Sequence, residues 1–228
     1  MSKKKNTLLR NTSILMAATI ISRVIGLLYR SPLGETIGNE GLGYYSTASN
    51  LYTILLLISS YSIPMAVSKI VSERLALKEY RNAHRVFHGA LIYAVIVGGI
   101  AALVAFFGGK FLLPYNQQNA LLALRVLAPT IFFSAVLGVL RGYFQAHSTM
   151  MPTSISQIIE QVFNAAFSIG AAWFFIQQFA TNDTEHAKFG AAGGTLGTGA
   201  GVLAGFCFML TVYGVNRKTI LRKEARAT

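Results

Sequence analysis

Long apolar blocks, each about 20 residues or more and nearly free of charge, constrain this chain most strongly. About 20 apolar residues in a helix match the thickness of the hydrocarbon core of a bilayer. Charged residues make up only 12% of the chain, about half the share that is usual in soluble proteins. A transmembrane β-barrel would show alternating segments of about ten residues, and none is found. The sequence therefore predicts an all-α, polytopic membrane protein.

Six transmembrane helices are expected, and prolines mark several of their ends. Ser31-Pro32 is expected to close the first span and Pro114 the third, whereas Pro152 opens the fifth. The first apolar stretch is too long for the core of a signal peptide and lacks a clear cleavage site, so we interpret it as a retained span. The expected spans are approximately residues 11–33, 46–71, 87–113, 119–145, 152–178 and 190–214.

Lysine and arginine are distributed very unequally among the expected loops. One side of the membrane receives thirteen of them, and the other side receives only Lys188. Because basic loops stay in the cytoplasm, both termini are expected on the cytoplasmic side of the cell membrane. The net charge of +12 is explained by this bias, and no nucleic-acid partner is expected. The thirteen residues are Lys3, Lys4, Lys5, Arg10, Arg74, Lys78, Arg81, Arg85, Arg217, Lys218, Arg222, Lys223 and Arg226.

The first span carries two arginines on one helical face. Thr19, Arg23, Gly26 and Arg30 are spaced i, i+4, i+7 and i+11, which places them above one another on a helix. The arginines are about 10 Å apart along the axis. An arginine near mid-membrane costs about 2.5 to 3.5 kcal/mol of insertion free energy. Arg30 could extend to the outer interface instead, but Arg23 is too deep for this, which favours a functional role.

The fifth span has a polar stripe that lipid would not tolerate. The opposite face of the same helix is made of Ile, Val and Phe, so the polar side must meet protein or water. Helix–helix hydrogen bonding is the alternative to a functional cavity. A weaker polar face in the second span includes Asn50. The stripe consists of Gln157, Glu160, Gln161, Asn164 and Ser168.

Glycines and the remaining polar residues point mainly to packing. Gly193, Gly197, Gly201 and Gly205 form overlapping GxxxG steps in the sixth span and predict a close contact with another helix. Arg125, near the outer end of the fourth span, either faces the same cavity as the first-span arginines or extends to the interface.

No sequence motif indicates catalysis. The chain has no nucleophile elbow, P-loop or metalloprotease motif, and it has no acidic catalytic pair or large soluble loop. We therefore expect no enzymatic activity, no cofactor and no metal site, and a membrane-bound glycosyltransferase is disfavoured. The single cysteine, Cys207, excludes an intrachain disulfide.

Two segments resemble a known family. 'SRVIGLLYR' at 22–30, 'VLRGYFQAHSTMMPTSISQIIEQVFN' at 139–164 and the six-span layout are similar to polysaccharide and lipid II flippases. These form the MurJ/SpoVB-like branch of the multidrug/oligosaccharidyl-lipid/polysaccharide exporter superfamily. The resemblance implies one six-helix lobe, 1–228, of a two-lobe transporter, with a second lobe as its partner and this chain as an N-terminal fragment. It also implies export of undecaprenyl-pyrophosphate-linked saccharides by alternating access.

The resemblance also implies which residues bind the substrate. Arginines of the first span line the cavity in MurJ-like proteins, and Arg23 matches that pattern directly, whereas the spacing to Arg30 is one residue longer. The second-span arginine of those proteins has no counterpart in 'LYTILLLISS' (51–60). The glycan could therefore be lipid II, a teichoic or capsular precursor, or another polyprenyl-linked cell-wall saccharide.

The hypothesis from the sequence is a flippase in contact with membrane lipids. Its arginines would hold the pyrophosphate through paired, charge-assisted hydrogen bonds. Two alternatives remain open. A multidrug exporter for cations should carry acidic cavity residues, and a non-transporting membrane scaffold should tolerate loss of Arg23. The expected substrate-binding residues are Arg23, Arg30, Arg125, Asn50, Gln157, Glu160, Gln161 and Asn164.

Overall fold

The computed structural model describes the backbone of residues 2–225 and the side chains of residues 12–216. Every regular element in this part of the chain is helical, and it contains no strand. The elements are α1 (Ser2–Leu28), α2 (Arg30–Ser59), α3 (Ile63–Ala76), α4 (Tyr80–Leu112), the 3-10 helix η1 (Tyr115–Ala120), α5 (Leu121–Ala146), α6 (Met151–Phe179) and α7 (Asp183–Ala225).

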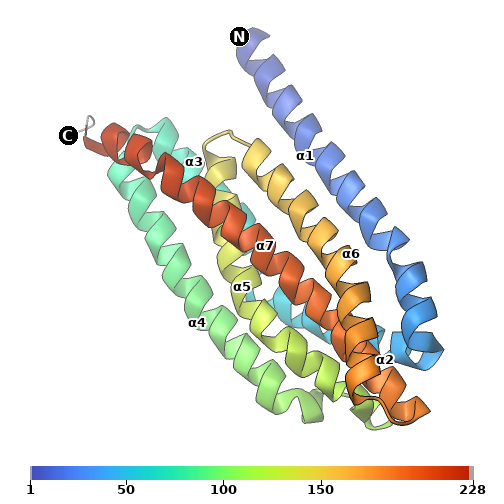
Figure 1. Cartoon of the computed structure of the whole chain (residues 1–228). Coiled ribbons are helices and arrows are strands. Elements are labelled where there is room, and N and C mark those ends of the chain that lie inside the picture. The colour runs from blue at the N-terminus through green and yellow to red at the C-terminus, as the bar shows by residue number, and fades with distance from the viewer. Residues whose placement is uncertain (1, 226–228) are drawn as a thin grey trace.

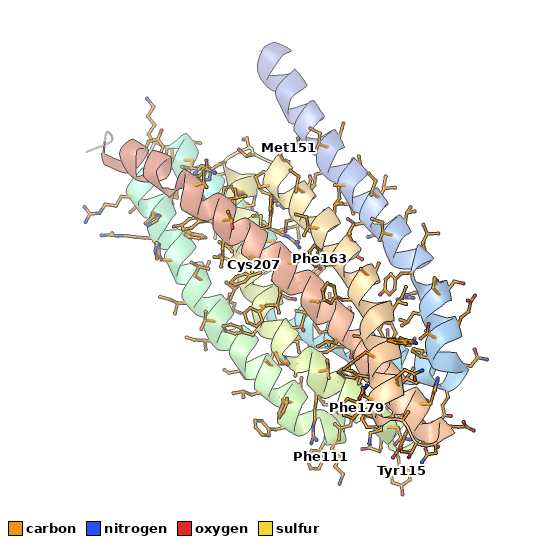
Figure 2. The ribbon with its side chains drawn as sticks, viewed as in Figure 1. Phe111, Tyr115, Met151, Phe163, Phe179 and Cys207 are labelled. Carbon is orange, nitrogen blue, oxygen red and sulfur yellow. The ribbon has the colours of Figure 1, made fainter. Side chains whose placement is uncertain are left out.

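The helices have the length and composition of membrane spans. Five helical segments are long and apolar enough to cross a bilayer, and Thr12–Leu28 adds a shorter apolar helix. Large apolar side chains cover the outside of the bundle (Figure 2), as lipid contact requires. Phe111, Tyr115 and Phe179 lie together at the end of the bundle away from the termini. The prediction of an all-α, polytopic membrane protein is therefore confirmed. The five segments are Arg30–Ala76, Tyr80–Leu112, Tyr115–Ala146, Met151–Phe179 and Asp183–Asn216.

The first expected loop is mostly helical. The helix was expected to close at Ser31-Pro32, but α1 ends at Leu28 and Pro32 lies in the first turn of α2. Pro32 has no N–H to donate to the carbonyl of Leu28, which explains a break at this position. Helix α2 then bends at Gly38, whose φ of +73° suits a residue without a side chain. The expectation of a loop at 34–45 was wrong.

The second expected span is two helices. Helix α2 ends at Ser59, and α3 begins at Ile63 with Pro64 in its first turn. Because Pro64 cannot donate a backbone hydrogen bond to the Ser60 carbonyl and its ring crowds that group, a break is favoured here. The N–H groups of Ser60 and Tyr61 both bond to the carbonyl of Leu56 instead. The boundaries 46–71 missed this break.

Helices α5 and α6 agree closely with two of the other four expected spans, whereas α4 begins earlier, at Tyr80, and α7 extends over Asp183–Ala225, beyond both expected ends. These four helices form a layered bundle. Helices α4 and α5 pack together, α6 and α7 pack together, and α7 also contacts α5 and α2. Helix α1 packs mainly against α6 and stands apart from the rest of the bundle (Figure 1). The start of α1 and the end of α7 lie at the same end of the molecule, as an even number of spans requires.

The glycine ridge of α7 makes the close helix contact that the sequence predicts. A Cβ atom on Gly193 would collide with the backbone of Ala171 and Ala172 in α6. One on Gly197 would collide with Ser168 in the same helix. Since no side chain fits between the two backbones, these glycines set the α6–α7 distance. This contact holds one wall of the cavity described next.

Candidate functional site

A polar cavity of about 670 Å³ lies among α1, α2, α5, α6 and α7. It borders a second cavity of about 480 Å³ that extends towards the break between α2 and α3. Five elements distant in sequence contribute to the first cavity, so only the folded bundle creates it. Its polar lining in a lipid-exposed chain is the feature expected of a functional site in a membrane protein.

The polar face of the first span lines this cavity. Thr19, Arg23, Gly26 and Arg30 all belong to its wall, although the helix is interrupted between α1 and α2. Their common face persists because Tyr29, at the interruption, keeps helical angles of −74° and −16°. Within the described residues, Arg23 and Arg30 make no hydrogen bond or ion pair. Both side chains are exposed and available to an anion.

The polar stripe of α6 is divided between the cavity and the helix interface. Gln157, Glu160 and Gln161 line the cavity and are partly buried. Asn164 also reaches the cavity but is only 7% exposed. Ser168 is fully buried, and its hydroxyl lies 2.8 Å from the Gly194 carbonyl oxygen in α7. The stripe thus combines the two roles that the sequence left as alternatives.

A buried hydrogen-bond network joins the α1–α2 junction to α6 and α7. The hydroxyls of Tyr29 and Tyr45 are 2.6 Å apart. The amide nitrogen of Asn164 donates to the Tyr29 hydroxyl at 3.4 Å, and Thr198 donates to the Asn164 amide oxygen at 3.3 Å. Because Tyr29 directly precedes Arg30, the network restrains the backbone that carries this arginine. The two tyrosines were not predicted from the sequence, because the need of a tyrosine hydroxyl for a partner becomes evident only once its burial is known.

Glu160 forms an ion pair with Arg141, which the sequence analysis did not select. The Arg141 Nη2 atom lies 2.7 Å from a carboxylate oxygen of Glu160. The same guanidinium donates to the Ser156 hydroxyl at 2.8 Å and 3.3 Å. The sequence could have pointed to Arg141, because it is a charged residue inside the apolar fourth span. The negative charge of Glu160 is therefore balanced by Arg141 of α5, and this carboxylate does not pair with Arg23 or Arg30.

Two expected site residues lie elsewhere. Arg125 is exposed, donates from Nε to the Phe106 carbonyl oxygen at 3.3 Å, and sits 5.8 Å from the centre of the Phe106 ring. It belongs to the α4–α5 surface, and it does not line the cavity. Asn50 is exposed on α2 and also does not line the cavity, whereas its neighbour Ser49 does. Sequence spacing could not give the rotation of these helices in the bundle.

The charges of the cavity favour an anionic ligand. Arg23, Arg30 and Arg141 face it with one carboxylate, Glu160, so two positive charges are uncompensated. One guanidinium group can form two parallel hydrogen bonds with phosphate oxygens. These bonds are stronger in a cavity that is shielded from bulk water. The described residues contain no group of three side chains that could hold a metal ion.

Comparisons with known proteins place the chain among relatives. Three Bacillus subtilis proteins are similar to the chain. Stage V sporulation protein B is 28% identical over 96% of the chain and 42% of its own length. Lipid II flippase MurJ is 27% identical over 75% of the chain and 34% of its own length. The uncharacterized membrane protein YabM is 22% identical over 85% of the chain and 35% of its own length.

The chain thus spans about two fifths or less of the length of these relatives. No solved structure matches it significantly. The model of a family described as polysaccharide biosynthesis protein matches residues 8–226. Because this match covers nearly the whole sequence, including all the residues that line the cavity, the chain belongs to the polysaccharide biosynthesis protein family.

Proposed function

We propose that the chain is part of a flippase for undecaprenyl-pyrophosphate-linked saccharides, working by alternating access across the cytoplasmic membrane. The observation that carries this proposal is the pair of arginines, Arg23 and Arg30, which are exposed on one wall of a polar cavity and have no partner among the side chains of residues 12–216. Family membership and the name of the relative MurJ support the same transport class.

Arg23 and Arg30 bind the pyrophosphate in this mechanism. Their spacing of about 10 Å along the helix suits an extended anion better than one carboxylate. Each planar guanidinium offers two parallel donors to phosphate oxygens. The amides of Gln157 and Gln161, on the adjoining helix α6, hydrogen-bond the sugar hydroxyls. Recognition rests on the pyrophosphate, so lipid II and teichoic or capsular precursors all fit this part of the site.

We propose further that 1–228 forms one lobe and that a second six-helix lobe faces the cavity. The relatives are more than twice as long as the part they share with the chain. The helices described here would enclose the substrate on one side only, because Arg23 and Arg30 remain exposed. The chain by itself should therefore move no lipid-linked saccharide across reconstituted vesicles. Robust transport by the isolated chain would contradict this.

The termini of the chain are assigned to the cytoplasm. Thirteen basic residues on one side against Lys188 on the other support this orientation. A cysteine that replaces Asp183 should react with an impermeant thiol reagent added to intact cells. A cysteine that replaces Lys78 should react only after the membrane is opened. The reverse pattern would overturn the orientation.

A transport assay with two arginine variants tests the function. Arg23→Ala in the full-length protein should abolish flipping of a lipid-linked saccharide in vesicles, with a normal protein level on immunoblots. Arg125→Ala is the matched control, because Arg125 is exposed and does not line the cavity. If Arg23→Ala transports normally, or fails only because the protein is absent from the membrane, Arg23 does not bind the substrate and its proposed role is wrong.

The charge of the cavity also separates this proposal from a multidrug exporter. A cation exporter needs a carboxylate that is available to its substrate. In the described part of the cavity the one carboxylate is Glu160, and Arg141 already neutralises it. Transport of an organic cation that Arg23→Ala leaves intact would support the exporter instead.

A further inference from the structure

The Arg141–Glu160 ion pair lies at the boundary between the two polar cavities. Both residues line the larger cavity, which holds the first-span arginines, and both line the smaller one. Their side chains are 16% and 21% exposed, so the pair is mostly shielded from solvent but still faces both spaces. A charge in this place acts on any ligand that enters either cavity.

We propose that Arg141 is a positioning residue that holds the Glu160 carboxylate and thereby keeps two arginines available for the anion. This inference rests on the proposed function, because it assigns a role within the same site. Without Arg141, the carboxylate would share its cavity with two unpartnered guanidinium groups. It would then attract Arg23 or Arg30 and compete directly with the substrate.

The geometry favours this role over a helix clamp. Helix α6 is already held against α7 by the glycine ridge, where Gly201 approaches the Glu160 backbone. The Ser156 hydroxyl donates to the Gly205 carbonyl oxygen at 3.4 Å, a further link that does not use the ion pair. The contact between α5 and α6 also includes a hydrogen bond from Thr153 to the Arg141 carbonyl oxygen at 3.5 Å. Helix packing therefore has other supports, whereas Glu160 has one ion-pair partner in the described residues.

Two of the three guanidinium nitrogens of Arg141, Nε and Nη2, are already used as donors. Its guanidinium donates to Glu160 and, from two nitrogens, to Ser156. A residue that binds substrate directly would keep such donors available, as Arg23 and Arg30 do. Arg141 therefore acts on the anion through Glu160.

The test compares pyrophosphate binding by three variants of the full chain in detergent, measured by calorimetry. Arg141→Gln leaves the carboxylate uncompensated and should weaken binding by about tenfold. Glu160→Gln removes the carboxylate and should bind at least as tightly as the parent. The double variant Arg141→Gln/Glu160→Gln should recover most of the loss. Arg74→Gln is the matched control, because the Arg74–Glu79 pair at 3.0 Å lies outside both cavities.

Several results would overturn the inference. A double variant no better than Arg141→Gln would mean that Arg141 binds the anion or clamps the helices. Parent-like binding by Arg141→Gln, or no pyrophosphate binding by the parent, would also reject it. If Arg141→Gln does not fold, the charge swap Arg141→Glu/Glu160→Arg decides, since it should bind like the parent. Failure of the transport assay alone would reject only the proposed function.

Discussion

The two sides of α6 meet their neighbours in opposite ways. Towards α7, backbones touch through glycines, and Gly197 lies directly against Ser168. Towards α1, the contact is polar and sparse. Thr19 donates to the Gln157 amide oxygen at 3.3 Å, and Gly26 faces the Gln161 side chain. The side of α6 that faces α7 is closed by backbone contact, whereas the side that faces α1 borders the cavity.

This difference separates stability from function along one helix. Close backbone contact maximises van der Waals packing, which drives helix association in lipid. Polar groups that stay partly unpaired cost stability, and they persist where a ligand uses them. Helix α6 therefore packs tightly on one side and borders the polar cavity, the proposed ligand site, on the other. The predictions below test this division, starting with the largest expected effect.

Filling the closed side should abolish folding. Gly197→Leu places a side chain where Ser168 already lies, and overpacking of this kind costs about 1 to 3 kcal/mol or more. We expect little monodisperse protein in size-exclusion chromatography of detergent extracts. Gly170→Leu is the control, because no atom lies within 4 Å of a Cβ built there. Equal yields of the two variants would show that the α6–α7 contact is not essential.

A change on the open side should affect transport and leave folding intact. Arg23→Lys keeps the positive charge but loses the planar pair of donors. We expect the flipping rate of the full-length protein to fall by about tenfold, the loss of roughly one charge-assisted hydrogen bond. Arg30→Lys should be milder because that residue lies nearer the interface. If Arg23→Lys lowered the amount of protein in the membrane more than the flipping rate per molecule, the division of α6 into a packing side and a cavity side would be wrong.

The hydrogen-bond network at the α1–α2 junction should have an intermediate effect on stability. Tyr29→Phe leaves the Tyr45 hydroxyl and the Asn164 amide with fewer partners in a buried place. We expect a loss of about 1 to 3 kcal/mol, measured as a lower midpoint of thermal unfolding in detergent. Tyr115→Phe, at a side chain that is 97% exposed, should change nothing. An unchanged midpoint for Tyr29→Phe would show that α1 is held in another way.

The smallest effect concerns a loop away from both sides of α6. A hydrogen bond from Asn82, followed by one from Arg74, lowers the pKa of Glu79 below its ordinary 4.5. The resulting stabilisation is present above the pKa of the unfolded chain and is lost as pH falls through the folded value. Glu79→Gln should therefore lower the unfolding midpoint slightly at pH 7 and match the parent in strong acid. If Glu79→Gln lowered the unfolding midpoint by the same amount at pH 7 and in strong acid, the charge of Glu79 would not be the source of the stabilisation.

Much of the architecture could be predicted from the sequence because it depends on local properties. Apolar length determined the membrane class, and helical spacing placed Thr19, Arg23 and Arg30 on one face. The breaks at Pro32 and Pro64 have equally local causes, since each proline removes one backbone donor. Pro32 was expected to end the first span, whereas the break at Pro64 was missed because the apolar block continues through it.

Only the tertiary structure decided which polar residues meet. Arg141 and Glu160 lie on different helices, and Tyr29 is far in sequence from Asn164. Spacing along one helix says nothing of its rotation against another, so the sequence alone kept Arg125 and Asn50 among the candidates for the cavity. The sequence by itself determined a membrane bundle with an arginine face and a polar stripe. The packing of α6 between α1 and α7 then decided which of those side chains share a cavity, because the glycine ridge determines which face of α6 is closed.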